Sequence, residues 1–178
     1  HFPNIEGFGV WAAKCNFTMG PDGKMYSRML GGNLVRIDVE NARGENLTNG
    51  DLVGTKDGSA YGLVFDPQDE NVFYFSNNDK HCIYKYDLRT KECACWAGQE
   101  GKSGYLDGPI GQAMFNKPGQ MCVDSEGNII LTDTENHCIR KITMSTGYVS
   151  TLAGKPQNSG YVNGSAEDAQ FKKPLGIC

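Results

Sequence analysis

The 178-residue sequence lacks the features that mark several large classes of protein. No apolar run approaches the roughly 20 residues that a membrane-spanning helix needs. No block of lysine and arginine occurs, and the formal net charge is −4, with 17 basic and 21 acidic residues. A nucleic-acid surface needs clustered positive charge, so this balance argues against a nucleic-acid partner.

Short catalytic motifs are also missing. The sequence contains no G-x-S-x-G, H-E-x-x-H, phosphate-loop or dinucleotide-binding pattern. No serine or cysteine can be combined with a histidine at a spacing that indicates a nucleophilic site. We therefore assign no catalytic residue and no cofactor, and an enzymatic role stays open but is not favoured.

Cysteine is present in an odd number, seven. Cysteine packs well inside strands as a small apolar residue, so free thiols in the core are the leading interpretation. A disulfide that uses Cys15, Cys93 or Cys95 is the alternative. The pair Cys93 and Cys95 has no second ligand pair at a suitable spacing, so we predict no zinc or other metal site.

What the sequence does contain is a set of short apolar runs separated by turn residues. Glycine is abundant, at 23 residues, as expected for many tight turns. Between residues 116 and 154, four runs of strand length follow one another at 120–123, 128–132, 137–143 and 148–152. The gaps are too short for a crossover helix, so neighbouring strands should pair antiparallel and form one small sheet.

This unit recurs along the chain with an offset of 56 residues. The matched pairs include Cys82 with Cys138, Gly98 with Gly154, Tyr105 with Tyr161, and Phe115 with Phe171. A fixed offset over many positions indicates a repeat protein. We predict repeats at about 14–60, 61–115 and 116–171, an incomplete one at 172–178, and a linker or a strand from a preceding unit at 1–13.

The best copy closely resembles the NHL repeat. The matching residues are Phe115, Pro118, Val123, Asp124, Gly127, Asn128, Asp133 and the run 136–142, and the loop pattern S-G-Y-x-(D/N)-G resembles a long-loop bacterial version. The resemblance implies an all-β fold, a β-propeller of four-stranded antiparallel blades. About three blades and the first strand of a fourth are expected here, as part of a ring of about six.

Polar residues in the turns and loops are the candidates for a binding site, although most of them have a plausible structural role. Short polar side chains fix turns, and the recurrence of histidine and tyrosine favours packing. The candidates are Asn77, Asp79, His81, Tyr105, Asp107, Asp133, Glu135, His137, Tyr161 and Asn163. In an up-and-down blade the segments 77–81, 133–137, 98–116 and 154–172 should share one face.

These observations lead to a functional hypothesis of a non-catalytic recognition or scaffold propeller. We expect it to lie outside the cytoplasm, at the cell surface or in the periplasm, and to bind a carbohydrate or a protein through one loop face. The alternative, which the resemblance implies, is a lyase or hydrolase with a metal site at the central channel. In either case we expect the remaining blades, or a second copy of the chain, to close the ring.

Overall fold

The computed structural model describes residues 13–29, 33–41, 43–48 and 61–178 of the chain. The predicted linker or strand at 1–13 lies outside the described residues except for Ala13, and so does the predicted end of the first repeat, residues 49–60. Within the described residues the regular structure is almost entirely β, with one short 3-10 helix, η1 (Thr134–Asn136).

Three antiparallel sheets follow one another along the chain, and we call them blades 1, 2 and 3. In each blade the four strands lie in chain order. Blade 1 holds β1 (Ala13–Met19), β2 (Met25–Met29), β3 (Leu34–Asp38) and β4 (Arg43–Asn46). Blade 2 holds β5 (Leu63–Phe65), β6 (Val72–Asn77), β7 (Cys82–Asp87) and β8 (Cys93–Ala97). Blade 3 holds β10 (Pro118–Val123), β11 (Ile129–Asp133), β12 (Cys138–Thr143) and β13 (Tyr148–Ala153).

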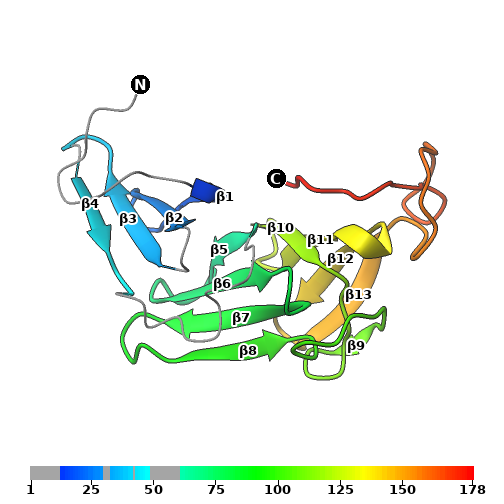
Figure 1. Cartoon of the computed structure of the whole chain (residues 1–178), viewed down its shortest axis with the longest axis horizontal. Coiled ribbons are helices and arrows are strands. Elements are labelled where there is room, and N and C mark those ends of the chain that lie inside the picture. Colours follow the sequence, from blue (N-terminus) through cyan, green and yellow to red (C-terminus); the bar gives the residue numbers. More distant parts are fainter. Residues whose placement is uncertain (1–12, 30–32, 42, 49–60) are drawn as a thin grey trace.

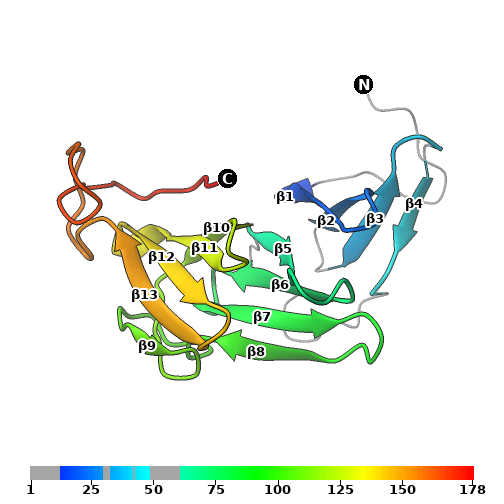
Figure 2. The ribbon, with the colours of Figure 1, turned by 180° about the vertical axis from the view of Figure 1, so that it is seen from behind.

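The blades are arranged side by side around a common inner side. Figures 1 and 2 show the first strands β1, β5 and β10 gathered together, while the fourth strands β4, β8 and β13 lie at the periphery. This arrangement confirms the predicted all-β propeller architecture. A two-residue strand, β9 (Gly108–Pro109), comes from the loop that leaves blade 2 and pairs with β13 as a fifth, outermost strand of blade 3.

Tight turns set the strand boundaries where polar side chains and glycine allow them. Between β10 and β11, Asp124 Oδ1 accepts hydrogen bonds from the backbone N–H groups of Glu126 and Asn128, at 3.0 and 2.8 Å. Gly127 closes this turn with φ 81°, a left-handed conformation that favours glycine. In the strands before and after such a turn, successive side chains point to opposite faces of the sheet, so each face can pack on one neighbouring blade.

Two hydrophobic cores fill the spaces between the blades. The first lies between blades 1 and 2, where Tyr26 and Leu34 pack with residues such as Phe65 and Phe73. The edge of the Phe65 ring meets the Tyr26 ring at a centroid distance of 4.7 Å. The second core lies between blades 2 and 3, and its buried members include Val64, Val72, Tyr74, Ile83, Phe115, Met121, Ile129, Leu131, Ile142 and Val149. Each blade is therefore stabilised by the blade next to it.

The last residues of the sequence lie along the inner side of blade 3, in the place where a further first strand is expected. Thr134 Oγ1 donates to the carbonyl oxygen of Pro174 at 2.9 Å, and the backbone N–H of Ile177 donates to Gln120 Oε1 at 3.2 Å. The segment has no strand partner of its own, and the side chain of Leu175 is 62% exposed.

Candidate functional site

A buried arginine lies at the junction of blades 2 and 3. Arg140 projects from β12, and its side chain is fully buried. Its guanidinium donates through Nη1 to Asp133 Oδ2 at 2.7 Å and through Nη2 to Asp107 Oδ1 at 2.6 Å. Two backbone carbonyl oxygens, those of Met114 and Leu106, accept further hydrogen bonds at 3.2 and 2.9 Å. Charge-assisted bonds of this kind are strong and directional, so Arg140 fixes the geometry of the junction.

Asp133 is the buried carboxylate of this cluster. Besides Arg140, it accepts hydrogen bonds from the backbone N–H of Asn116 at 2.7 Å and from Asn136 Nδ2 at 2.8 Å. Burial raises the pKa of Asp133 to about 6, against the lowering effect of Asn136 and Arg140. The carboxylate is therefore ionised at neutral pH.

The loop that leaves blade 2 supplies the other half of the cluster. Asp107 also accepts a hydrogen bond from the backbone N–H of Thr151 at 3.1 Å. The hydroxyl groups of Tyr105 and Thr151 lie 2.7 Å apart. The guanidinium carbon of Arg140 lies 4.8 Å from the centre of the Tyr105 ring, in cation–π contact. These contacts, which we call the Arg140 cluster, fasten the loop of blade 2 onto strands β12 and β13 of blade 3.

The two predicted histidines have the same role in consecutive blades. Nδ1 of His81 accepts a hydrogen bond from the backbone N–H of Lys117 at 3.1 Å, and Nδ1 of His137 accepts one from Lys173 at 3.2 Å. Both histidines have left-handed backbone angles, with φ 55° and 59°. Burial lowers the pKa of His81, which favours the neutral ring that this acceptor role needs. Each histidine therefore holds the start of the next blade in place, as the repetition of the residue predicts.

The turn residues at the end of the second strands behave differently in the two blades. Asn77 Oδ1 accepts hydrogen bonds from the backbone N–H groups of Asp79 and Lys80, at 3.1 and 3.0 Å, which confirms its predicted turn-fixing role. Asp133, at the equivalent position, bonds the side chain of Asn136 in its own turn and reaches beyond that turn to Arg140. Glu135 pairs with Lys173 Nζ at 3.0 Å.

The predicted common face is formed by contacts between the turns and the loops. The backbone N–H of Gly101 donates to the carbonyl oxygen of Lys80, and that of Gln157 donates to Asn136, both at 2.8 Å. The middle of the first loop departs from this face. It reaches the outer edge of blade 3 because its residues 108–109 pair with β13. The loop therefore wraps the following blade, and only its two ends lie on the shared face.

Tyr161 and Asn163 belong to the second loop, where no counterpart of the Arg140 cluster is found among the residues that the structure describes. The Tyr161 side chain is 83% exposed, and the ring contacts Lys172 Nζ at 5.9 Å from its centre. The backbone of this loop nevertheless repeats the first one, since residues Val162 and Gln170 pair as Leu106 and Met114 do.

Cys82, Cys93, Cys95, Cys122, Cys138 and Cys178 are free thiols, in line with the leading interpretation, while the side chain of Cys15 lies outside what the structure describes. Cys82 and Cys138 are fully buried. Burial raises the pKa of the Cys138 thiol to about 12 and that of Cys93 to about 11, so both stay protonated at neutral pH. Within the part of the chain that the structure describes, no group of three or more His, Cys, Asp or Glu side chains is placed to hold a metal ion.

Sequence reasoning missed Arg140, Asn136 and Thr151, the partners that complete the cluster. A signal for Arg140 was available, because it alternates with Cys138 and Ile142 on the buried face of a strand, where a charge needs a partner. The described residues contain no helix with the length and apolarity to cross a membrane.

The fold and the blade junctions define a segment of a β-propeller. Residues 115–142 match the family model described as NHL repeat. The chain therefore carries an NHL repeat, and its blades have the architecture of an NHL β-propeller.

The chain spans less than half the length of the relatives and solved structures that it matches. NHL repeat-containing protein 2 from Bos taurus is 29% identical over 104 residues, which cover 58% of this chain and 14% of the relative. A Bacteroides thetaiotaomicron structure of unknown function superposes with a TM-score of 0.78 and 26% identity, over 89% of this chain and 40% of that one. An auxiliary nutrient binding protein from the same organism gives a TM-score of 0.68 and 27% identity, over 90% and 41%.

Proposed function

We propose that this chain is part of a binding propeller that recognises a carbohydrate or a protein through the face on which the turns and inter-blade loops meet. The observation that carries the proposal is the similarity, at 27% identity, to a protein described as nutrient binding, combined with a rigid loop face. Propellers position ligand-binding groups on such loops while the blades supply the scaffold.

The chemistry of the face supports a polar partner. Side chains of both signs recur at the blade junctions, where the exposed Asp79 and Lys117 correspond to the half-buried Glu135 and the exposed Lys173 one blade further on. The Arg140 cluster engages Tyr105, Asp107 and Asp133. These three side chains therefore stabilise the face and are not placed among the ligand contacts. We therefore place the ligand contacts at Asp79, Glu135 and their neighbouring lysines.

The compartment forms part of the same proposal. We place the protein outside the cytoplasm of a bacterium, at the cell surface or in the periplasm. The support is that two solved structures to which the chain is 26% and 27% identical come from Bacteroides thetaiotaomicron, and that one of them is described as a nutrient binding protein.

The experiment is a binding screen of the purified protein against an array of immobilised oligosaccharides, followed by calorimetry with the best soluble hit. The double substitution Asp79→Ala and Glu135→Ala should weaken binding by at least about tenfold, or about 1.4 kcal/mol. Glu70→Ala is the control, because Glu70 is exposed in the turn between β5 and β6, at the opposite end of the blade. An equal loss of sugar binding in the Glu70→Ala control contradicts the assignment of the site to this face. If the protein binds no sugar, the proposal shifts to a protein partner. Turnover of a bound sugar indicates the enzyme alternative.

We also propose that further blades, or a second copy of the chain, complete the ring. Apolar side chains are exposed on β13 and in the loop that follows it, with Leu152 44% and Val162 46% exposed. Single apolar residues are ordinary on a surface, but a group of them favours a covering partner. Light scattering of the 178-residue chain tests the second copy, since a stable monomer leaves further blades as the remaining way to cover this face.

A further inference from the structure

The 56-residue offset allows the two junctions of blades 2 and 3 to be compared position by position. In the loop of blade 2, the backbone N–H of Gly104 donates to the carbonyl oxygen of Phe115 at 3.0 Å. In the loop of blade 3, Gly160 donates to Phe171 at 3.1 Å. The N–H of Gly154 also donates to Ala166 at 2.8 Å, the same distance as in the equivalent bond of blade 2. Blade 3 therefore carries a preformed copy of the loop with which blade 2 holds its neighbour.

In blade 2, two bulky residues fill the outer part of this junction. The Trp96 ring lies against Tyr74 at a centroid distance of 4.2 Å and packs on the core shared with blade 3. Ile110 donates its backbone N–H to the carbonyl oxygen of Gly147 at 2.9 Å. Gly147 lies in the turn between β12 and β13, and Met144 of the same turn packs on the same core. The turn between the third and fourth strands is thus the element that meets this surface.

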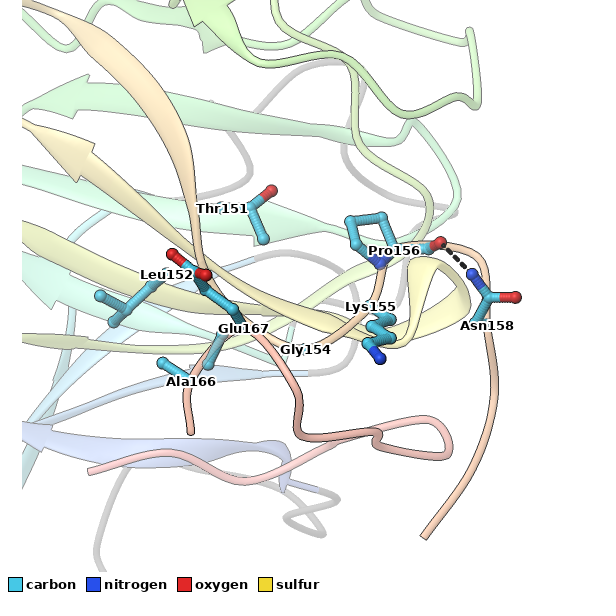
Figure 3. Close-up of a pocket in the computed structure, with 9 residues that line it drawn as sticks. Thr151, Leu152, Gly154, Lys155, Pro156, Asn158, Ala166 and Glu167 are labelled. Atoms are coloured by element: carbon cyan, nitrogen blue, oxygen red, sulfur yellow. Dashed lines mark hydrogen bonds between the residues drawn. The ribbon is translucent and has the colours of Figure 1, made fainter. Parts of the chain in front are cut away.

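In blade 3, the equivalent positions hold the smaller residues Leu152 and Ala166. A cleft of about 400 Å³ opens there between the end of β13 and the following loop (Figure 3). Lys155, Pro156 and Glu167 also line it. The cleft therefore occupies the position at which Trp96 and Ile110 support the turn of blade 3.

We propose that this cleft is the socket for the turn between the third and fourth strands of a following blade in the same polypeptide, and that this turn carries a side chain bulkier than methionine at the position of Met144. The inference rests on the proposed completion of the ring. Interiors are close-packed, so a junction with smaller residues on one side needs larger ones on the other.

A second copy of this chain is a poorer occupant. Its blade 1 would supply the turn that joins β3 to β4, in which Val39 takes the position of Met144. Val39 is 63% exposed, but valine is smaller than methionine and would leave the cleft partly unfilled. The size of the socket therefore favours a different blade over a second copy.

The test uses the full chain extended by a copy of its own residues 123–178, because Cys178 corresponds to Cys122. In the extended chain the appended methionine that corresponds to Met144 faces the cleft. Replacing that methionine by phenylalanine should raise the Tm by about 2–4 °C, because the larger ring fills the socket. Met144→Phe in blade 3 is the matched control. It should lower the Tm, because Trp96 and Ile110 already fill that junction.

Hydrogen exchange and the Tm together distinguish the proposed occupant of the cleft from the proposed completion of the ring. Protection of the Ala166 backbone N–H from hydrogen exchange in the extended chain reports that the appended blade has docked, because the equivalent N–H of Ile110 donates to Gly147 of the next blade. If Ala166 is protected but the appended phenylalanine lowers the Tm as Met144→Phe does, the socket is wrong while the ring stands. If Ala166 stays unprotected, both are wrong. A dimer of the unextended chain that protects Leu152 identifies the occupant as a second copy and overturns the proposal.

Discussion

Arg140 and Asp107 join two consecutive blades through a 2.6 Å ion pair, although Arg140 lies on β12 of blade 3 and Asp107 lies on the loop that leaves blade 2. The guanidinium is fully buried and also reaches Asp133, so one side chain holds a loop, a turn and a strand together. A buried ion pair whose two Nη groups are hydrogen-bonded to two carboxylates and two carbonyls favours one arrangement, because any other leaves a charge without a partner.

Replacing Arg140 by methionine should destabilise the protein by about 3–5 kcal/mol, because it leaves Asp133 buried without its cationic partner. Urea unfolding followed by circular dichroism measures the loss. The double variant Arg140→Met with Asp133→Asn should recover part of it, since the uncompensated charge is gone. A loss below about 1 kcal/mol for Arg140→Met alone contradicts the structural role of the Arg140 cluster.

Replacing His81 by alanine should cost about 1–2 kcal/mol, because the backbone N–H of Lys117 loses its acceptor while the strain at φ 55° remains. His81→Gly loses the same acceptor without the strain, so it should be less destabilising by about 1 kcal/mol. Thermal melts of the two variants measure the difference. If His81→Gly is as unstable as His81→Ala, backbone strain at position 81 contributes nothing to the difference.

Gly98 and Gly154 provide a matched pair for the packing of the two junctions. Both have φ 95°, and an added Cβ would lie 2.9 Å from the Phe115 ring or 2.8 Å from the Phe171 ring, respectively. Strain at such backbone angles costs about 1–3 kcal/mol in either variant.

The two glycine variants should nevertheless differ. Phe115 is fully buried and cannot move, whereas Phe171 is only half-buried and can give way. Gly98→Ala should therefore be more destabilising than Gly154→Ala in denaturant unfolding. The reverse order would show that the Phe115 junction is not the tighter one.

The acid stability of the protein should depend on Asp124. Hydrogen bonds, first from the backbone N–H of Asn128 and then from Lys141, lower the pKa of Asp124 from 3.8 to about 2. A carboxyl group with a lowered pKa in the folded state stabilises that state above pH 4. This contribution is lost as the pH falls through about 2. In the Asp124→Asn variant, the free energy of unfolding from urea titrations should therefore fall less steeply between pH 4 and pH 2 than in the unaltered protein. The same pH dependence in both proteins would contradict the role of Asp124.

Local patterns allowed much of the fold to be predicted from the sequence. The strands of blades 2 and 3 follow from apolar runs bounded by turn residues, and the recurrence of His81 as His137 correctly indicated a structural role. The course of the loop after blade 2 could not be predicted, because pairing of Gly108 with Val149 depends on a contact between distant parts of the chain. The ion pair between Asp107 and Arg140 could not be predicted either, since 33 residues separate them in the sequence.

The loops at residues 103–108 and 159–164 form one repeated docking element, of which the first is bonded to the next blade through Tyr105, Asp107 and Gly108 and the second is exposed. Amide hydrogen exchange of the 178-residue chain, compared with that of the chain extended by a further blade, distinguishes the two loops. Exchange should be slow at 103–108 in both proteins, whereas exchange at 159–164 should be fast and become slow only in the extended one. Equal exchange of the two loops in the 178-residue chain, or fast exchange at 159–164 after extension, would contradict this shared docking role.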